Sequence, residues 1–269
     1  MEKQQNFTHP GRIYSYFCES MKIAVIGCGW LGLPLAKRLK DLGHEVHGST
    51  TRDFNLSLLA DSGIQGFVYD GTSHAQLSEK VKESEIAILN FPPSRSADYA
   101  AQVRDIIAQF SAETKLIFTS STGVYQDFDG PCSELSPINA THPVFLAEEA
   151  VRFSARQFTI LRLAGLISED RHPVKYLSGK QNADGQKVVN LVHREDVIAT
   201  ILTVLKNEVW QETFNVCYPA HPTRAAYYTE QAEKRHLLPP KFTFSAGSGK
   251  EIEASKFVLH LEFTFSHSI

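Results

Sequence analysis

The feature that most constrains this chain is a glycine-rich turn that directly follows a short apolar run near its start. The run is Ile23–Ile26, and residues 27–32 then read Gly-Cys-Gly-Trp-Leu-Gly. In such a turn the first glycine permits the sharp bend where a strand ends. The second lets the backbone approach a diphosphate, and the third lets the next helix pack closely on the strand. That helix presents unpaired N–H groups and its positive dipole end to the phosphates. The predicted contacts with a dinucleotide are Gly27, Gly29, Trp30, Leu31 and Gly32.

The residues after the turn favour this interpretation over a turn whose glycines serve packing alone. Pro34 falls in the first turn of the predicted helix, where the missing N–H of proline would have had no partner. A second strand is predicted at His44–Gly48. The apolar residues at helical spacing between them are Leu31, Leu35, Leu39 and Leu42. The chain therefore has the strand, turn, helix and second strand that the motif requires.

Composition places the chain among globular proteins and limits its partners. At 269 residues it is long enough for one substantial core with a small second lobe, and its net charge of −3 gives no electrostatic footprint for nucleic acid or an anionic membrane. No apolar run approaches the ~20 residues that span a bilayer. We therefore expect a small-molecule substrate and neither nucleic acid nor a membrane as partner.

The cysteines indicate a reducing, cytoplasmic compartment. Cys18, Cys28, Cys132 and Cys217 are far apart and form no C-x-x-C pair, so neither a zinc site nor a disulfide framework is expected. Cys28 occupies a variable position of the glycine turn, close to a helix start that could activate a thiol. We interpret it instead as a small side chain that fills a tight place.

The organisation of the chain follows from where the first strand begins. Residues 1–20 are polar or mixed and lack the apolar segment of a signal peptide. Because Met21 stands directly before the strand, we expect the natural start there and interpret residues 1–20 as an extension. Residues 21–165 are predicted to form the dinucleotide-binding core. Residues 166–269 are predicted to supply the last sheet strand or strands, interleaved with a small substrate-side lobe.

The end of the second strand is where such a chain distinguishes NAD from NADP. An acidic residue there, about 20 residues past the glycines, would bond the ribose 2′-hydroxyl. Positions 46–51 contain no acid, and Thr50, Thr51 and Arg52 precede the first one, Asp53. Hydroxyls followed by a guanidinium suit a 2′-phosphate, so NADP is favoured over NAD, with a solvated loop arginine as the alternative.

Two later strand ends should lie beside the glycine turn, because the carboxyl ends of parallel strands share one edge. The strand Glu85–Leu89 runs into Phe91 and Pro92, which we expect beside the adenosine half of the cofactor. The strand that begins at Lys115 ends in the hydroxyl run 119–122. There Ser120 is expected to contact the cofactor, while Ser121 and Thr122 orient the substrate oxygen. Turn formation and helix capping are the alternatives for these residues.

Four motifs occur in order and at suitable intervals: the glycine turn, Ser-Ser-Thr-Gly-Val-Tyr at 120–125, Arg-Leu-Ala-Gly at 162–165, and Asn-Leu-Val-His-Arg-Glu-Asp at 190–196. Together they resemble the extended short-chain dehydrogenase/reductases, the NAD-dependent epimerase/dehydratase superfamily. Gly-Trp-Leu-Gly-Leu-Pro-Leu-Ala and the proline pair 92–93 are similar, more narrowly, to its atypical YeeZ-like branch. The resemblance covers residues 21–265 or so.

The resemblance implies an α/β Rossmann fold, with a doubly wound parallel sheet of about seven strands and a small C-terminal α/β lobe. It also implies that Leu163 and Ala164 line the nicotinamide pocket, that the substrate is a nucleotide sugar, and that a homodimer forms. The chemistry would be that of an oxidoreductase or an epimerase.

The chain departs from the family's pattern where catalysis is expected. Catalytic members place a tyrosine about 20–30 residues beyond the serine strand, with a lysine four residues later that lowers the pKa of the tyrosine. Here Thr141 or a neighbour stands at the tyrosine position, and Val144 or Phe145 at the lysine position. Neither a threonine nor an apolar side chain transfers protons near neutral pH. A non-catalytic module that senses NADP(H) is therefore the alternative function.

Nearby residues offer few replacements for the missing pair. His142 would serve as acid or base if it pointed into the crevice, although a solvated loop residue is the favoured interpretation. Glu148 and Glu149 stand at helical spacing from Arg152, which predicts exposed ion pairs.

Three helices are predicted toward the end of the chain, and the middle one covers Ala225–Leu237. One runs over Val197–Lys206 and is capped by Asp196, and the last runs over Glu251–Leu259 or so.

Overall fold

The computed structural model describes residues 19–71, 74–93, 98–244 and 246–269. Nearly all of the expected N-terminal extension, residues 1–18, lies outside the described residues, and Cys18 lies there with it.

A parallel sheet forms the centre of the molecule. Within the described residues it contains seven strands, in the order β11-β7-β5-β4-β1-β2-β3, and every neighbouring pair is parallel. The strands are β1 (Lys22–Ile26), β2 (Glu45–Thr50), β3 (Gln65–Val68), β4 (Ile86–Leu89), β5 (Lys115–Ser121), β7 (Phe158–Leu163) and β11 (Glu212–Val216). The central strands are continuous apolar runs because helices cover both of their faces. The predicted doubly wound α/β fold is confirmed.

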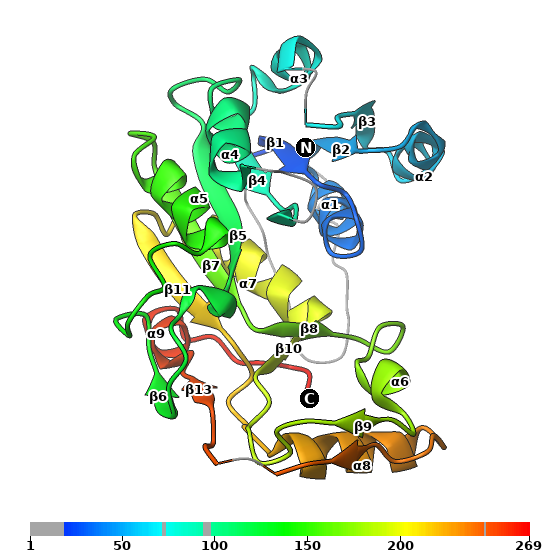
Figure 1. Ribbon diagram of the computed structural model, residues 1–269. Coiled ribbons are helices and arrows are strands. Elements are labelled where there is room, and N and C mark those ends of the chain that lie inside the picture. Colours follow the sequence, from blue (N-terminus) through cyan, green and yellow to red (C-terminus); the bar gives the residue numbers. More distant parts are fainter. Residues whose placement is uncertain (1–18, 72–73, 94–97, 245) are drawn as a thin grey trace.

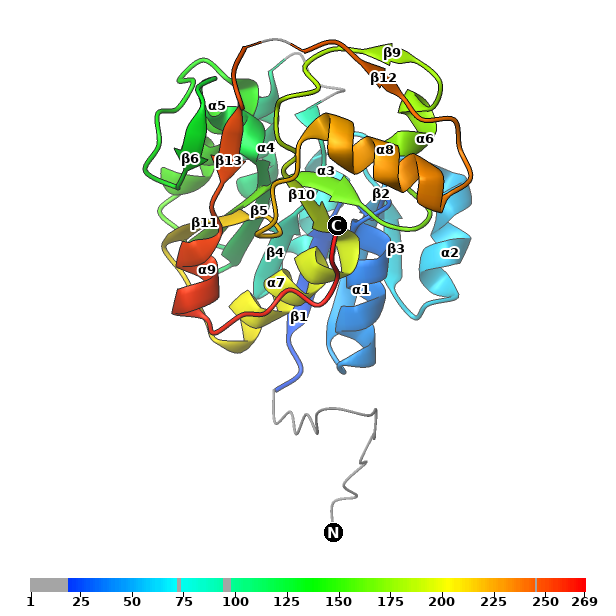
Figure 2. The same ribbon diagram turned by 90° about the horizontal axis from the view of Figure 1, so that it is seen from below.

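Helices lie on both faces of this sheet (Figures 1 and 2). One face carries α1 (Gly32–Asp41), α2 (Leu56–Ala60) and α7 (Arg194–Lys206). The other carries α3 (His74–Val81), α4 (Tyr99–Ile107) and α5 (Pro143–Arg152). In α1 the predicted apolar stripe is buried at Leu35 and Leu39, while Leu42 is 36% exposed because the helix has already ended.

The strand order reverses between β1 and β4, which start the two halves of the sheet. At such a switch point the connections leave in opposite directions and open a crevice outside the carboxyl ends of the strands. The glycine turn follows β1 at this point.

A smaller lobe closes the far side of the crevice. Its short parallel pairs are β8 (Gly165–Ile167) with β10 (Leu191–His193) and β9 (Gln181–Asn182) with β12 (Lys241–Phe242). Its helices are α6 (Val174–Leu177) and α8 (Arg224–Lys234). A second apolar cluster holds it together: Ile167, Val174, Val189, Leu191, Tyr227, Tyr228 and Ala232. In Figure 2 this lobe lies over the end of the sheet where the crevice opens.

The predicted last helix is wrong over its first turn. Lys250–Ile252 is a strand, β13, that pairs with β6 (Gly130–Cys132), and helix α9 covers only Ser255–His260. The pairing partner lies more than a hundred residues away in the chain, so local apolar spacing could not reveal it.

The predicted cap of α7 is also wrong. The helix begins at Arg194, and His193 caps it by accepting a hydrogen bond from the backbone N–H of Glu195 (3.3 Å). Asp196 is 1% exposed, and its carboxylate accepts the backbone N–H groups of Ser266 (2.9 Å) and His267 (3.0 Å). A buried carboxylate requires several donors, and the C-terminal segment supplies them.

The prediction of exposed ion pairs on α5 is wrong for Glu148. This residue shares the buried face of the helix with Val144 and Val151, and its side chain is fully buried. Arg162, 3% exposed, donates to both of its carboxylate oxygens (2.8 and 3.0 Å), and Ser120 donates to one of them. The spacing to Arg152 did not reveal which face of α5 docks on the sheet.

The neighbouring glutamate provides a matched test of this buried pair. Glu148→Ala should lower the free energy of unfolding by ~3–5 kcal/mol, because it leaves the Arg162 guanidinium buried without its carboxylate. Glu149→Ala removes only a partly exposed contact with Arg152 and should cost about 1 kcal/mol or less. Urea denaturation measures both. Equal losses would contradict the assignment of Glu148 to the core.

Candidate functional site

The three glycines of the turn meet three different steric conditions. Gly27 has φ +104°, and a Cβ on it would lie 2.1 Å from the carbonyl oxygen of Asn90. A Cβ on Gly32 would lie 2.1 Å from the carbonyl oxygen of Gly27. A Cβ on Gly29 would meet no atom within 4 Å. The turn thus needs glycine for its bend and for helix packing, and it leaves open space at the position where a diphosphate would approach. The residues present fit a dinucleotide.

Two side chains that the sequence reasoning missed hold the turn in place. The backbone N–H of Gly27 donates to Ser49 Oγ (2.9 Å), and that of Cys28 donates to the Ser49 carbonyl (2.8 Å). Asn90 Nδ2 donates to the Gly27 carbonyl (3.1 Å), while Thr119 Oγ1 donates to Asn90 Oδ1 (3.1 Å). The sequence contains a signal for both, since each is a polar residue at the carboxyl end of a strand, and β2 and β4 are the two strands that flank β1.

The amides that follow the turn are left for a ligand. Among the described residues, no acceptor is assigned to the backbone N–H of Trp30, Leu31 or Gly32, and no side chain caps α1. Gly32 is the first residue of α1 and Leu31 is its N-cap, so these amides lie at a helix start, where N–H groups require an outside partner. Burial raises the pKa of the Cys28 thiol to about 12, so it is not a thiolate at neutral pH.

At the end of β2 the three residues predicted to select the cofactor differ in exposure. Thr50 is buried, and its Oγ1 accepts Asn55 Nδ2 (3.2 Å) and the backbone N–H of Arg52 (3.4 Å). Thr51 and Arg52 are exposed. The Arg52 guanidinium lies 5.5 Å from the ring centroid of Phe54, itself exposed. The Arg52 guanidinium is therefore an exposed cation at the end of β2, and it takes no part in the buried core.

The loop after β4 is held by one aromatic contact. The half-buried Phe91 ring packs edge-on against Tyr99, with centroids 5.5 Å apart, and Tyr99 OH donates to the Phe91 carbonyl (2.7 Å). Pro92 is exposed. Residues 94–97, which follow the proline pair, lie outside the described residues.

The hydroxyl run at the end of β5 divides between two faces, as strand alternation requires. Ser120 points to α5, where its hydroxyl bonds Glu148, so it could approach a cofactor only through its backbone. Ser121 Oγ accepts the backbone N–H of Gly123 (3.0 Å), and no acceptor for its own O–H is assigned among the described residues. Thr122 Oγ1 donates weakly to the Leu163 carbonyl (3.4 Å). Ser121 therefore keeps a proton to donate.

His142 is not the solvated loop residue that the sequence favours. It is half-buried and caps α5, with Nδ1 accepting the backbone N–H of Val144 (3.2 Å). Because that N–H can only donate, Nδ1 is unprotonated and Nε2 carries the proton of the neutral ring. A Cβ on Gly123 would lie 3.3 Å from Ser121 Oγ and 3.8 Å from His142 Nε2. The hydroxyl and the imidazole N–H thus flank the same glycine.

Tyr125, Leu163 and Ala164 are buried in the main apolar cluster. Tyr125 accepts from Arg162 (2.9 Å) and donates to Asn215 (2.6 Å), and burial raises its pKa to about 12 against the lowering effect of Arg162. It is therefore no base near neutral pH. Leu163 and Ala164 are 6% and 5% exposed and pack in the main apolar cluster at the carboxyl end of β7.

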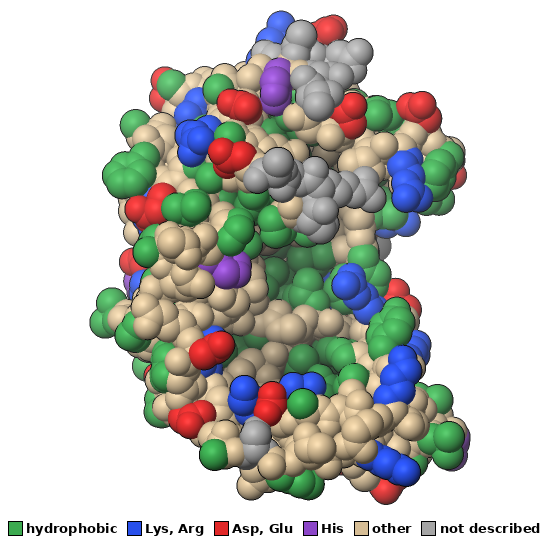
Figure 3. Space-filling model, in the orientation of Figure 1, with side chains coloured by type: hydrophobic (Ala, Val, Ile, Leu, Met, Phe, Trp, Pro, Cys, Tyr) green, Lys and Arg blue, Asp and Glu red, His purple; other side chains and the backbone are tan. Residues whose placement is uncertain are grey.

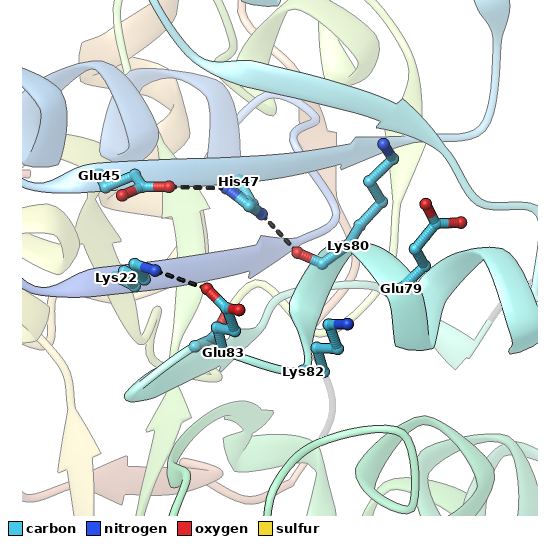
Figure 4. Close-up of a pocket in the computed structure, with 8 residues that line it drawn as sticks. Lys22, Glu45, His47, Glu79, Lys80, Lys82 and Glu83 are labelled. Carbon is cyan, nitrogen blue, oxygen red and sulfur yellow. Dashed lines mark hydrogen bonds and ion pairs between the residues drawn. The ribbon is translucent and has the colours of Figure 1, made fainter.

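A hollow is visible on the surface of the molecule. Figure 3 shows it between the sheet and the smaller lobe, with hydrophobic side chains deep inside and Lys and Arg side chains on the rim. Two other cavities, of about 170 and 660 Å³, lie at the opposite, amino edge of the sheet. Figure 4 shows the smaller one, where Lys22 pairs with Glu83 and His47 bonds Glu45. Lys22 and Glu45 begin β1 and β2, so this cavity is a strand length away from the glycine turn.

In the part of the chain that the structure describes, no cluster of three or more His, Cys, Asp or Glu side chains could hold a metal ion. No helix of that part is both long and apolar enough to cross a bilayer.

Comparisons with known proteins agree with this geometry. A family model described as NAD(P)H-binding matches residues 27–208. Protein YeeZ from Escherichia coli (strain K12) is 33% identical over an alignment 263 residues long, which covers 91% of this chain and 96% of YeeZ.

Solved structures share the fold at low sequence identity. UDP-N-acetylglucosamine 4-epimerase from Bacillus cereus has a TM-score of 0.72 at 16% identity, and the match covers 93% of this chain and 95% of that one. MoeE5 in complex with UDP-glucose and NAD has a TM-score of 0.74 at 15% identity, covering 92% and 94%.

Fold and glycine turn together define an NAD(P)-binding Rossmann protein. The chain belongs to the NAD(P)H-binding family, and Protein YeeZ is a relative over nearly its whole length. The family resemblance inferred from the motifs is confirmed.

Substitutions at Gly29 and Gly32 distinguish the role of the turn in ligand binding from its role in packing. Gly29→Ala should change the free energy of unfolding by no more than about 1 kcal/mol, because its Cβ meets open space. It should still weaken dinucleotide binding by about tenfold or more, since the Cβ enters the space next to the diphosphate. Gly32→Ala should instead destabilise the fold by ~1–3 kcal/mol. Thermal melts and calorimetric titration with NADPH distinguish the two, and unaltered NADPH affinity in Gly29→Ala would contradict this reading of the turn.

Proposed function

We propose that this protein is an NADP(H)-dependent oxidoreductase or epimerase that acts on a small substrate, with a nucleotide sugar as the substrate class. The cofactor, when bound, exchanges a hydride with the substrate carbon. MoeE5 with UDP-glucose and NAD supports the substrate class by its shared fold. The observation that carries the proposal is the pairing of Ser121 and His142 around Gly123, at the sheet edge that also holds the glycine turn.

In this proposal the chain's own groups orient and polarise the substrate oxygen. Ser121 Oγ accepts one hydrogen bond, from the backbone N–H of Gly123, and its own O–H would donate to the substrate. His142 Nε2–H is a second donor, and its ring orientation is fixed by the cap on α5. Thr122, whose bond to Leu163 is long, stands next to them. His142 polarises the oxygen and does not abstract its proton, because Nε2 already carries one.

The choice of NADP rests on Arg52. The guanidinium is exposed at the end of β2, and none of the positions 46–51 carries the acid that would bond a free ribose 2′-hydroxyl. A 2′-phosphate would find a charged donor there. The remaining expectations join the proposal: residues 21–165 as the cofactor-binding core, a homodimer, and a cytoplasmic location, the last in keeping with the free, buried Cys28, Cys132 and Cys217.

The Arg52 assignment predicts a change in cofactor preference. Arg52→Ala should weaken NADPH binding by ~1.5–3 kcal/mol, the cost of a lost charged hydrogen bond, and leave NADH nearly unaffected. Arg38→Ala on the exposed side of α1 removes the same charge away from β2 and serves as the control. Equal losses for NADPH and NADH in Arg52→Ala would contradict a 2′-phosphate contact.

The Ser121–His142 pair predicts two losses of turnover. Purified protein with NADPH is screened against carbonyl compounds and nucleotide sugars. On any substrate turned over, Ser121→Ala should lower kcat by ~10²–10³-fold, as the loss of a preorganised donor does. His142→Asn should lower kcat as well, although asparagine still caps α5, whereas His142→Ala should also lose ~1 kcal/mol of stability with the cap. Full turnover in Ser121→Ala or His142→Asn would remove that residue from the proposal.

A second candidate function is a non-catalytic module in which NADP(H) occupancy changes the shape of the crevice for a protein partner. What favours it is the sequence of α5, Pro-Val-Phe-Leu-Ala-Glu-Glu-Ala-Val-Arg, which contains neither tyrosine nor lysine. It predicts micromolar or tighter binding of NADPH without hydride exchange on any substrate. Transfer of label from labelled NADPH to a substrate would reject it.

A further inference from the structure

A side-chain contact joins the glycine turn to the smaller lobe across the crevice. The indole Nε1–H of Trp30 donates to Asp170 Oδ2 (3.0 Å). The guanidinium carbons of Arg171 and Arg194 lie 5.0 and 4.9 Å from the centroid of the same indole ring. Two cations therefore rest on an aromatic side chain that belongs to the proposed phosphate-binding turn.

The topology of the lobe explains why these residues meet. Strands β8 and β10 are parallel neighbours, so their carboxyl ends lie at one edge. Residues 168–171 follow β8, and Arg194 follows β10 as the first residue of α7. Both arginines thus leave the same edge and reach toward Trp30.

The charge on the two arginines is only partly satisfied. Arg194 contacts Glu195 (3.2 Å) and, at the longer distance of 3.4 Å, Asp170. Arg171 is exposed, and within the described ranges no carboxylate forms an ion pair with it. Trp30 itself has a backbone N–H without an assigned acceptor, as have the next two residues. Guanidinium groups and unpaired amides, the donors that phosphates prefer, therefore converge from the two sides of the crevice.

We propose that Arg171 and Arg194, held against the indole of Trp30, are the cationic side chains of a diphosphate-binding site whose other half is the main chain of the glycine turn. The inference deepens the proposed function and rests on it. The ligand is a diphosphate ester, a chemistry shared by the dinucleotide and by a nucleotide sugar. Asp170 is the negative group in this cluster, and its carboxylate opposes the ligand.

The site predicts effects of opposite sign from neighbouring residues. Arg171→Ala and Arg194→Ala should each weaken binding by about ten- to a hundredfold, the range for a lost hydrogen bond to a charged group. Asp170→Asn keeps an oxygen that accepts the Trp30 N–H but removes the negative charge, so it should strengthen binding. Arg104→Ala, an exposed arginine on α4, controls for net charge.

Calorimetric titrations of the full chain with NADPH, NADH and UDP test the proposal, and thermal melts confirm that each variant is folded. If the site holds the dinucleotide, both arginine variants weaken NADPH and NADH equally, unlike the expected effect of Arg52→Ala. If only UDP binding weakens, the site stands and its diphosphate is that of the substrate. Unchanged affinities for all three ligands in variants that still bind NADPH would overturn the inference and leave the proposed function intact. Failure of the wild-type protein to bind NADPH or NADH would overturn both.

Fluorescence provides a readout independent of heat. The chain has two tryptophans, Trp30 and Trp210, so Trp210→Phe leaves Trp30 as the reporter of this site. The emission of Trp30 should change saturably with whichever of NADPH, NADH or UDP binds in the calorimetric titrations. The reason is that a bound diphosphate would either draw both guanidinium groups away from the indole ring or hold them in place over it. Emission that stays constant while calorimetry shows binding would contradict a site at Trp30.

Discussion

The structure depends on a backbone that comes within contact distance of itself where β1 becomes α1. With a methyl group on Gly27 or Gly32 the chain could not pass Asn90 or close the helix onto the turn, because either Cβ would lie 2.1 Å from a carbonyl oxygen. Leu31 and Gly32, at the start of α1, have backbone N–H groups with no assigned acceptor among the described residues. Packing therefore requires Gly27 and Gly32, while Gly29 leaves open space where the proposed diphosphate would approach.

The parallel sheet converts this local turn into a site. Because the strand order reverses between β1 and β4, the ends of β1, β2, β4 and β5 meet at one edge. Three of them contribute a polar side chain there: Ser49 on β2 and Asn90 after β4 hold the turn, and Ser121 ends β5. The lobe adds charge from the other side through Arg171 and Arg194. In the proposed site the main chain would position the phosphates, and the side chains would select the cofactor and the chemistry.

The sequence was most informative where function depends on adjacent residues. The glycine turn, the parallel sheet and the polar strand ends could all be predicted, since each is a local pattern combined with a topological rule. The fate of Glu148 could not, because its burial depends on the side of α5 that docks, and helical spacing to Arg152 fits either answer. Asp196 was mistaken for a cap because its true partners, Ser266 and His267, lie seventy residues away. The role of His142 became visible only when α5 was placed beside Gly123. Contacts between distant segments are what a single sequence does not record.

The central claim is that main-chain amides at the start of α1 hold the diphosphate, and hydrogen exchange at individual residues tests it most directly. In the free protein the backbone N–H groups of Trp30, Leu31 and Gly32 lack an assigned acceptor and should exchange rapidly. With saturating NADPH these three amides should become protected, together with few others outside the crevice. Exchange at the free-protein rate for all three, while calorimetry shows NADPH bound, would contradict the account.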